Sequence, residues 1–198
     1  MTPKSKQLQE AADYIGKALT TLGIPIGGEH MSGTPRRVAR AWAEMMRNHD
    51  VALFDPKTLK FNPGSGIKLA TFKAPANSQL VVVRDISFTS VCAHHLMPFY
   101  GKVSIGYVPM ERILGLSKFA RIVEHCSKAP QTQEHLTTRI ACSLGALLEA
   151  RCVCVYMEAT HTCMSCRGAC ATGASTVTSF YWPHENIETK KEFLALLK

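Results

Sequence analysis

The sequence predicts an α+β protein in which a helical N-terminal extension precedes a ββααββ unit with an antiparallel sheet and a pair of helices. Three observations lead to this prediction. Apolar residues recur at helical spacing before residue 47, runs rich in Val, Ile, Thr and aromatics follow residue 66, and two amphipathic patterns stand between two pairs of those runs. We therefore expect residues 1–66 to form the extension and residues 67–198 the second domain.

The extension is expected to contain two helices. The first runs from Lys6 to Leu22 and ends at Gly23. The second begins at Thr34, a suitable N-cap, with Pro35 at the first helical position, where its missing N–H has no consequence. Residues 50–66 show no sustained periodicity and are expected to be a connection. The second helix carries an apolar stripe expected to contact the core, made of Val38, Ala41, Trp42, Met45 and Met46.

The remaining elements follow from local patterns. Residues 80–83 form a β-rich run, and residues 152–158 are apolar on both faces, as in a strand covered on both sides. Pro130 separates the two middle helices, which suits an antiparallel pair. The expected strands are 67–74, 80–88, 102–108, 152–158 and 174–182, and the expected helices are 117–126, 131–149 and 187–197.

Charge and composition restrict the partners. The net charge of +8 indicates an anionic partner or a basic surface. Because Lys and Arg are dispersed and no zinc-finger or RNA-binding signature accompanies them, we expect no nucleic-acid partner. No segment approaches the roughly 18 apolar residues of a membrane span, so we expect a soluble protein without a membrane partner. The first seven residues lack a signal-peptide core, which predicts a cytoplasmic location.

Two Cys- and His-containing segments are suited to metal binding. Cys92 and His95 stand at C-x-x-H spacing, which lets one turn direct a thiolate and an imidazole at a common point. His161 and Cys163 would share a face of an extended segment. Two thiolates and one imidazole form a three-ligand zinc set with an open fourth position, and a spare histidine beside it suggests proton transfer.

Spacing alone leaves the ligand set open. It does not decide between His94 and His95. Cys163 and Cys166 form a C-x-x-C that could be half of a structural zinc knuckle or a redox pair, with Cys170 as a further candidate. Four other cysteines are expected to be small core hydrophobes, namely Cys126, Cys142, Cys152 and Cys154.

Three arginines lie near the start of the second expected helix, at Arg36, Arg37 and Arg40. They are either a solvated face or a phosphate site helped by the helix N-terminus.

Six segments of the chain stand out as motifs: Thr34-Pro-Arg-Arg-Val-Ala-Arg40, Cys92-Ala-His-His-Leu-Met-Pro-Phe99, Gly115-Leu-Ser-Lys-Phe-Ala-Arg121, Gln131-Thr-Gln-Glu-His-Leu-Thr137, His161-Thr-Cys-Met-Ser-Cys-Arg-Gly168 and Thr176-Val-Thr-Ser179. Taken together and in this order, they resemble the GTP cyclohydrolase I family over nearly all the chain. The resemblance implies a tunnelling fold, whose units form a pentameric ring and whose rings pair into a homodecamer with active sites between subunits. It implies a hydrolase with a Zn2+ cofactor that opens the imidazole ring of GTP, releases formate and forms 7,8-dihydroneopterin triphosphate for tetrahydrofolate or pterin biosynthesis.

The resemblance also implies residue roles. Cys92, His95 and Cys163 would bind zinc, while His94 and His161 would transfer protons. The other matched positions would contact the substrate: Gln133 and Glu134 at the guanine edge, Ser117, Lys118, Arg121 and Arg167 around the ribose and triphosphate, and Arg37 and Arg40 at the triphosphate tail.

The sequence departs from the family at several positions. Ala93 replaces the usual Glu, Ala129 and His135 replace Arg, and the segment 180–183 replaces a Gly-Xaa-Phe. One alternative is therefore a relative that opens a different purine or stops at a formamidopyrimidine intermediate. A non-enzyme alternative is a zinc-stabilised binding protein with a basic surface, against which the spare histidines argue.

Overall fold

The centre of the molecule is a five-stranded sheet in the order β5-β2-β3-β6-β7. The computed structural model describes residues 5–49, 62, 65–68, 70–182 and 187–198. Neighbouring strands from β2 to β7 are antiparallel, whereas β5 pairs in parallel with the end of β2. The strands are β2 (Val81–Cys92), β3 (Pro98–Val108), β5 (Pro130–Gln131), β6 (Cys152–His161) and β7 (Thr176–Trp182).

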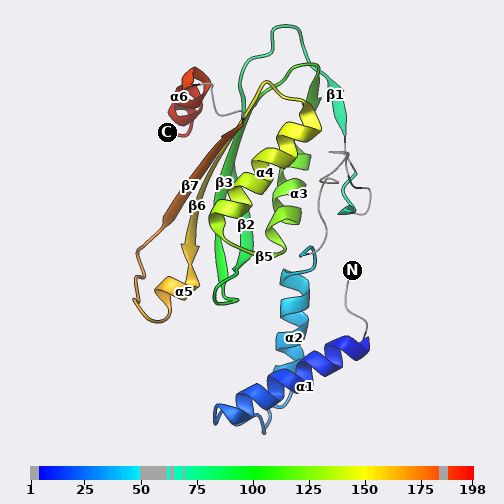
Figure 1. The fold of residues 1–198 in the computed structure, drawn as a ribbon, viewed down its shortest axis with the longest axis vertical. Helices are drawn as coiled ribbons and strands as arrows, with labels where there is room; N and C mark the ends of the chain where they lie inside the picture. The colour runs from blue at the N-terminus through cyan, green and yellow to red at the C-terminus, as the bar shows by residue number, and fades with distance from the viewer. Residues whose placement is uncertain (1–4, 50–61, 63–64, 69, 183–186) are drawn as a thin grey trace.

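Two helices, α3 (Ser117–Ser127) and α4 (Gln133–Leu148), cover one face of this sheet (Figure 1). Their apolar stripes meet the inward side chains of the strands, and Ile122 and Ile140 are fully buried there. The order β2-β3-α3-α4-β6-β7 confirms the predicted ββααββ unit and its α+β class.

A third helix, α6 (Ile187–Leu196), packs on the opposite face of the sheet. Its Phe193 is fully buried beside Cys152 and Cys154, which alternate along β6 with residues facing α4. The prediction that this strand is covered on both faces is therefore confirmed. Arg84 donates to the main-chain oxygens of Leu196 and Leu197 at 3.0 and 2.9 Å, which holds the end of α6 against β2.

Gly101 permits the close approach of β3 and β6. A Cβ atom at this position would collide with the Glu158 carbonyl oxygen and lie 2.7 Å from the Ala159 Cα. Both neighbours are main-chain atoms of β6, which cannot move away from a new Cβ atom as a flexible side chain can. We therefore expect Gly101→Ala to lower the free energy of unfolding by about 3 kcal/mol, measured by urea denaturation. Gly27→Ala is the control, because a Cβ atom there meets nothing within 4 Å; equal stability of the two variants would contradict the prediction.

The N-terminal extension forms the helices α1 (Ser5–Thr21) and α2 (Thr34–Met45). The residues directly after α2 contact the last turns of α3: the guanidinium of Arg47 lies 2.7 Å from the Glu124 carboxylate, and the Asn48 backbone N–H donates to the Lys128 main-chain oxygen at 2.9 Å. Within the described residues, no helix is long and apolar enough to cross a membrane.

Two predictions about α2 are wrong. The N-cap is Gly33 rather than Thr34, whose hydroxyl turns back towards the main-chain oxygen of His30. The expected core stripe is only partly buried, because α2 packs mainly against α1; Ala39, outside the stripe, is buried, whereas Trp42 is 38% exposed.

Three further predictions need correction. The strand expected over 67–74 is limited to β1 (Thr71–Lys73), which pairs with β4 (Arg112–Leu114) in a separate two-stranded sheet. The helix expected from residue 131 starts at Gln133, because residues 130–131 join the main sheet as β5. Cys142 is exposed on the outer side of α4, unlike the other three predicted core cysteines. Residues 50–61 of the expected connection lie outside the described residues, and the domain boundary at residue 66 stays a prediction.

Candidate metal and active site

Five segments that are separate in the sequence meet at one end of the sheet. They are the turn between β2 and β3, the end of β6, the short helix α5 (Thr162–Ser165), strand β5 and the start of α4. The register that pairs Phe99 with His161 joins the first two segments. The Thr162 hydroxyl donates to the Pro98 main-chain oxygen at 2.6 Å and thereby ties α5 to the turn.

The turn after Cys92 is closed by the backbone. The Cys92 backbone N–H donates to the main-chain oxygen of Met97, and the Leu96 backbone N–H donates to the main-chain oxygen of Cys92, both at 2.8 Å. Leu96 reverses the chain with a positive φ of 52°, a conformation that costs about 1 kcal/mol or more for a residue with a Cβ atom. These bonds turn the side chains of Cys92 and His95 to the same side.

Cys92, His95 and Cys163 are brought together as one possible metal-binding group. Their ligand atoms all lie within 4.8 Å of one another, and the two sulfur atoms are 4.0 Å apart. Cys163 reaches this position from α5, so the expectation of an extended segment shared with His161 is wrong. Its location on a helical turn separates the two side chains.

The environment of the two thiols suits a shared cation. Burial and the adjacent Cys92 raise the pKa of the Cys163 thiol, while the nearby charge of Arg167 acts in the opposite direction. A bound metal ion would stabilise both thiolates, since metal ligation deprotonates cysteine. The donor set therefore fits a metal ion.

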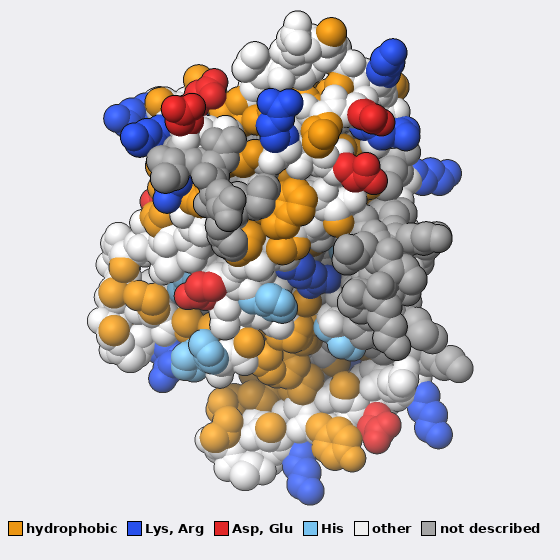
Figure 2. All heavy atoms as spheres, turned by 45° about the horizontal axis from the view of Figure 1, so that its top comes forward, with side chains coloured by type: hydrophobic (Ala, Val, Ile, Leu, Met, Phe, Trp, Pro, Cys, Tyr) orange, Lys and Arg blue, Asp and Glu red, His pale blue; other side chains and the backbone are white. Residues whose placement is uncertain are grey.

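His94 and His161 lie beside the group and outside it. The Nδ1 atom of His94 is 4.0 Å from the Cys92 sulfur. The His161 ring stacks on Phe99, with centroids 4.6 Å apart and planes 3° from parallel, and its Nε2 lies 2.8 Å from the Oε1 of Gln133. Several histidine side chains gather on one face of the molecule in Figure 2.

Glu134 adds a carboxylate to the same end of the sheet. Its pKa is lowered by its own backbone N–H, the Thr132 hydroxyl and the nearby rings of His161 and His94. Burial lowers the pKa of His161, which the Glu134 charge partly offsets. A neutral imidazole thus faces an ionised carboxylate near pH 7.

Comparison with known proteins now identifies the family. The sequence profile described as GTP cyclohydrolase I matches residues 11–198. The chain belongs to the GTP cyclohydrolase I family. It is 38% identical over 195 residues to the GTP cyclohydrolase 1 of Saccharomyces cerevisiae, covering 98% of this chain and 76% of that one. It is 42% identical to that of Deinococcus radiodurans, covering 81% and 69%, and 42% identical to that of Aquifex aeolicus, covering 86% and 85%.

A solved structure, of an archaeosine synthase QueF-Like in the apo form, is similar with a TM-score of 0.42 and 19% identity, over 55% of this chain and 95% of that chain. This likeness is too distant to bear on function.

Five positions assigned to substrate by resemblance to the GTP cyclohydrolase I family lie away from the metal-binding group. Ser117, Lys118 and Arg121 lie in the first half of α3, whose 11 residues span about 16 Å. The opposite end of α3 leads through β5 to the site. Arg37 and Arg40 are exposed on α2. The Arg37 guanidinium donates to the main-chain oxygen of His30 at 2.6 Å and to the hydroxyl of Thr34 at 3.0 Å.

The structure also reveals what sequence patterns missed. Strand β5 pairs Gln131 with Cys92 and so brings the start of α4 to the metal-binding group, although a two-residue strand has no periodic signal. Cys166 and Cys170 are exposed and lie outside the group formed by the described residues.

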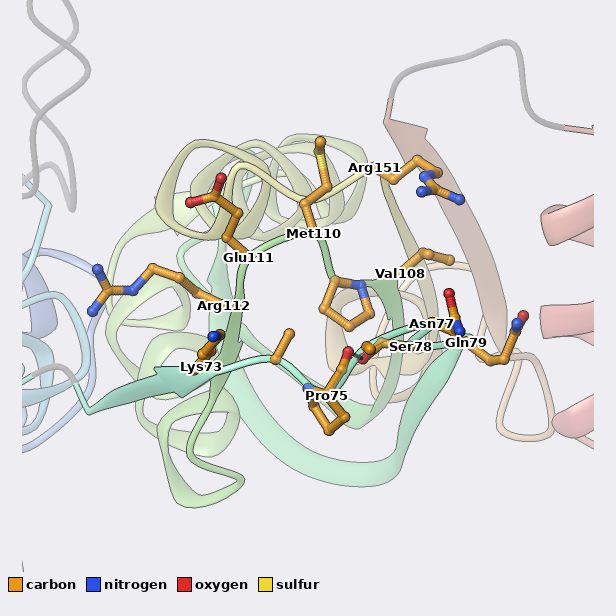
Figure 3. A pocket seen from close by; sticks show the side chains of 13 residues that line it. Lys73, Pro75, Asn77, Ser78, Gln79, Val108, Met110, Glu111, Arg112 and Arg151 are labelled. Carbon is orange, nitrogen blue, oxygen red and sulfur yellow. Dashed lines mark hydrogen bonds between the residues drawn. The ribbon is translucent and has the colours of Figure 1, made fainter.

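A cavity of about 1000 Å3 lies elsewhere, between the loops 73–79 and 108–112 (Figure 3). It adjoins Val108, the far end of β3 from the turn, and the 11 residues of β3 span about 36 Å. This GTP cyclohydrolase I family member therefore carries its Cys and His chemistry at the other end of the sheet from that cavity.

Proposed function

We propose that this protein is a zinc-dependent GTP cyclohydrolase I, which hydrolyses the imidazole ring of GTP, releases formate and forms 7,8-dihydroneopterin triphosphate. The observation that carries the proposal is the convergence of a two-cysteine, one-histidine group, two further histidines and an ionised carboxylate at one end of the sheet. Membership of the family supports the same activity.

Zinc is the metal that we propose for Cys92, His95 and Cys163. Tetrahedral zinc with thiolate ligands at 2.3 Å places the two sulfurs about 3.8 Å apart, close to the observed 4.0 Å. Three protein ligands leave one position open, as in catalytic sites. When bound, zinc would supply the Lewis acidity that makes water nucleophilic near pH 7.

The neighbouring residues would bind the base and move protons. His94 lies beside the metal-binding group and His161 lies at the same end of the sheet, so we assign both of them proton transfer at the purine ring. Glu134 is exposed and ionised, and its carboxylate would accept hydrogen bonds from the ring N–H and amino group of guanine. Arg167, close to Cys163, would bind phosphate.

We further propose that the substrate site is completed by other copies of the chain. The first half of α3 is too far from the metal-binding group of its own chain for Ser117, Lys118 and Arg121 to share one substrate with it through short contacts. Among the described strands, β7 has no outer partner, and β2 is paired on its outer edge only at Val91 and Cys92. Open edges favour pairing with another chain.

These edges suit a ring. Because β2 and β7 run in opposite directions, β7 of one copy can add to β2 of the next as an antiparallel neighbour, and repetition of this contact closes a ring. We propose a homodecamer of two pentameric rings, in which Arg37 and Arg40 reach a neighbouring site.

Sedimentation tests this assembly. We expect active protein to sediment at ten times the chain mass of 21.8 kDa. An active preparation with the mass of a single chain would reject the shared site.

The proposed location is the cytoplasm and the proposed pathway is tetrahydrofolate or pterin synthesis. All eight cysteines are free thiols, as expected in a reducing compartment.

A nucleotide panel tests the substrate. GTP, ATP, guanosine and 8-oxo-GTP are incubated with zinc-loaded protein, and loss of the purine, formate and pterin fluorescence are all measured. We expect both products from GTP and little from ATP. Because Glu134 would be the group that distinguishes the guanine edge, Glu134→Ala should reduce the preference for GTP over ATP at least about 100-fold.

The panel also separates the alternatives. Loss of GTP without formate or pterin would indicate an enzyme that stops at a formamidopyrimidine, and faster loss of guanosine or 8-oxo-GTP than of GTP would indicate another purine substrate. Zinc binding without turnover of any purine would indicate a binding protein.

A further inference from the structure

We propose that Gln133 is a positioning residue that holds His161 as the tautomer protonated on Nε2, so that Nδ1 is the atom through which His161 accepts and returns a proton. The inference rests on the proposed function for its catalytic consequence. It assigns to Gln133 a role other than direct contact with guanine.

The orientation of the Gln133 amide is determined by its surroundings. Its Nε2 lies 2.9 Å from the Thr176 main-chain oxygen and 3.3 Å from that of Met157. Main-chain oxygens only accept hydrogen bonds, so a flipped amide would place Oε1 against two acceptors. The nitrogen must therefore face β6 and β7, and Oε1 must face His161.

Two threonines reinforce this orientation. Thr137 donates its hydroxyl hydrogen to the Gln133 main-chain oxygen at 2.8 Å, which leaves its oxygen to accept from Thr178 at 2.7 Å. The Thr178 hydroxyl, having donated its hydrogen, can only accept from the Gln133 Nε2 at 3.1 Å. The donor and the acceptor of each of these hydrogen bonds are thus determined, and together they require the Gln133 amide to present Oε1 to His161.

The consequence falls on the His161 ring. Oε1 only accepts, and it lies 2.8 Å from the His161 Nε2, so this nitrogen must carry a hydrogen. A neutral imidazole carries one N–H, which leaves Nδ1 as its only acceptor. Stacking on Phe99, with planes 3° from parallel, fixes the plane of the ring around that bond.

This arrangement leaves Gln133 little capacity for a substrate. The residue is 2% exposed, and both ends of its amide already have partners within the chain. The adjacent Glu134 is exposed and has its carboxylate near both histidines. We therefore separate the two roles: Glu134 contacts the base, and Gln133 acts through His161.

The test compares Gln133→Met with Gln133→Glu in zinc-loaded protein at pH 8. Methionine fills a similar volume without an acceptor, so the 15N spectrum of the His161 ring should change from a single Nε2–H tautomer to a mixture. The kcat for GTP should fall at least about tenfold, with KM for GTP changed by less than about threefold. Glutamate keeps an oxygen that accepts from His161, so the tautomer should persist. Its second oxygen would replace the amide nitrogen and lie against the main-chain oxygens of Thr176 and Met157, so the Tm should fall.

Gln131→Met is the matched control. Gln131 is another buried glutamine, and its Nε2 donates to the Cys126 main-chain oxygen at 2.6 Å without contact to His161. We expect lower stability and an unchanged His161 tautomer. An unchanged tautomer in Gln133→Met, or a raised KM with unchanged kcat, would overturn the inference. Absence of GTP turnover by the wild type would instead refute the proposed function, while the spectra would still decide the tautomer.

Discussion

Cys163→Ala is expected to lose both the bound metal and detectable formate release. The Cys163 sulfur lies 4.0 Å from that of Cys92, within a group whose ligand atoms are all within 4.8 Å of one another. Removing one of three protein ligands leaves a thiol and an imidazole, too few for a stable tetrahedral site. Metal analysis of purified protein should show about one zinc per chain in the wild type and less than about a tenth of that in the variant.

Cys166→Ala is the matched control, because this cysteine directly follows α5, three residues after Cys163, but is exposed and outside the group. It should keep its zinc and its turnover. Loss of zinc from Cys166→Ala together with retention in Cys163→Ala would transfer the ligand role to the second cysteine of the C-x-x-C.

His94→Ala should lower kcat by about 100-fold or more while retaining the metal. The Nδ1 of His94 is 4.0 Å from the Cys92 sulfur, yet His95 supplies the imidazole of the metal-binding group. Loss of a proton-transfer group affects the chemical step and leaves the ligands in place. Single-turnover kinetics with zinc analysis on the same sample measures both quantities.

His95→Ala provides the comparison and should lose zinc as well as activity. The two histidines are adjacent in the sequence and both are exposed, so solvent access does not explain a difference between them. If His94→Ala loses zinc and His95→Ala keeps it, the two roles are reversed.

The helices and long strands of the sheet were predictable because their signals are local. Ile122 and Ile140 lie on apolar stripes that are buried as the pattern indicates. The position of α2 was not predictable from the sequence, because the burial of its apolar stripe depends on which element packs against it. Trp42 in this stripe remains 38% exposed. Cys142 likewise fits an apolar pattern but faces outward.

Part of the candidate site was likewise predictable from the sequence, and part was not. Spacing marked Cys92 and Cys163 as metal candidates, but the choice of His95 over His94 depends on the direction of each side chain after the turn. The contact between Gln133 and His161 joins residues 28 positions apart and has no sequence signal. It arises from β5 and from the pairing of β6 with β7, which only the folded sheet supplies.

Metal-dependent release of formate from GTP is the most direct test of the proposed activity. Protein stripped of metal with a chelator and freed of the chelator is assayed with GTP before and after addition of one equivalent of zinc per chain. We predict no formate before addition, and one formate per GTP consumed after it, with pterin fluorescence rising in parallel. Formate release that is unchanged in fully metal-free protein, or absent with zinc bound at Cys92, His95 and Cys163, would contradict the proposal.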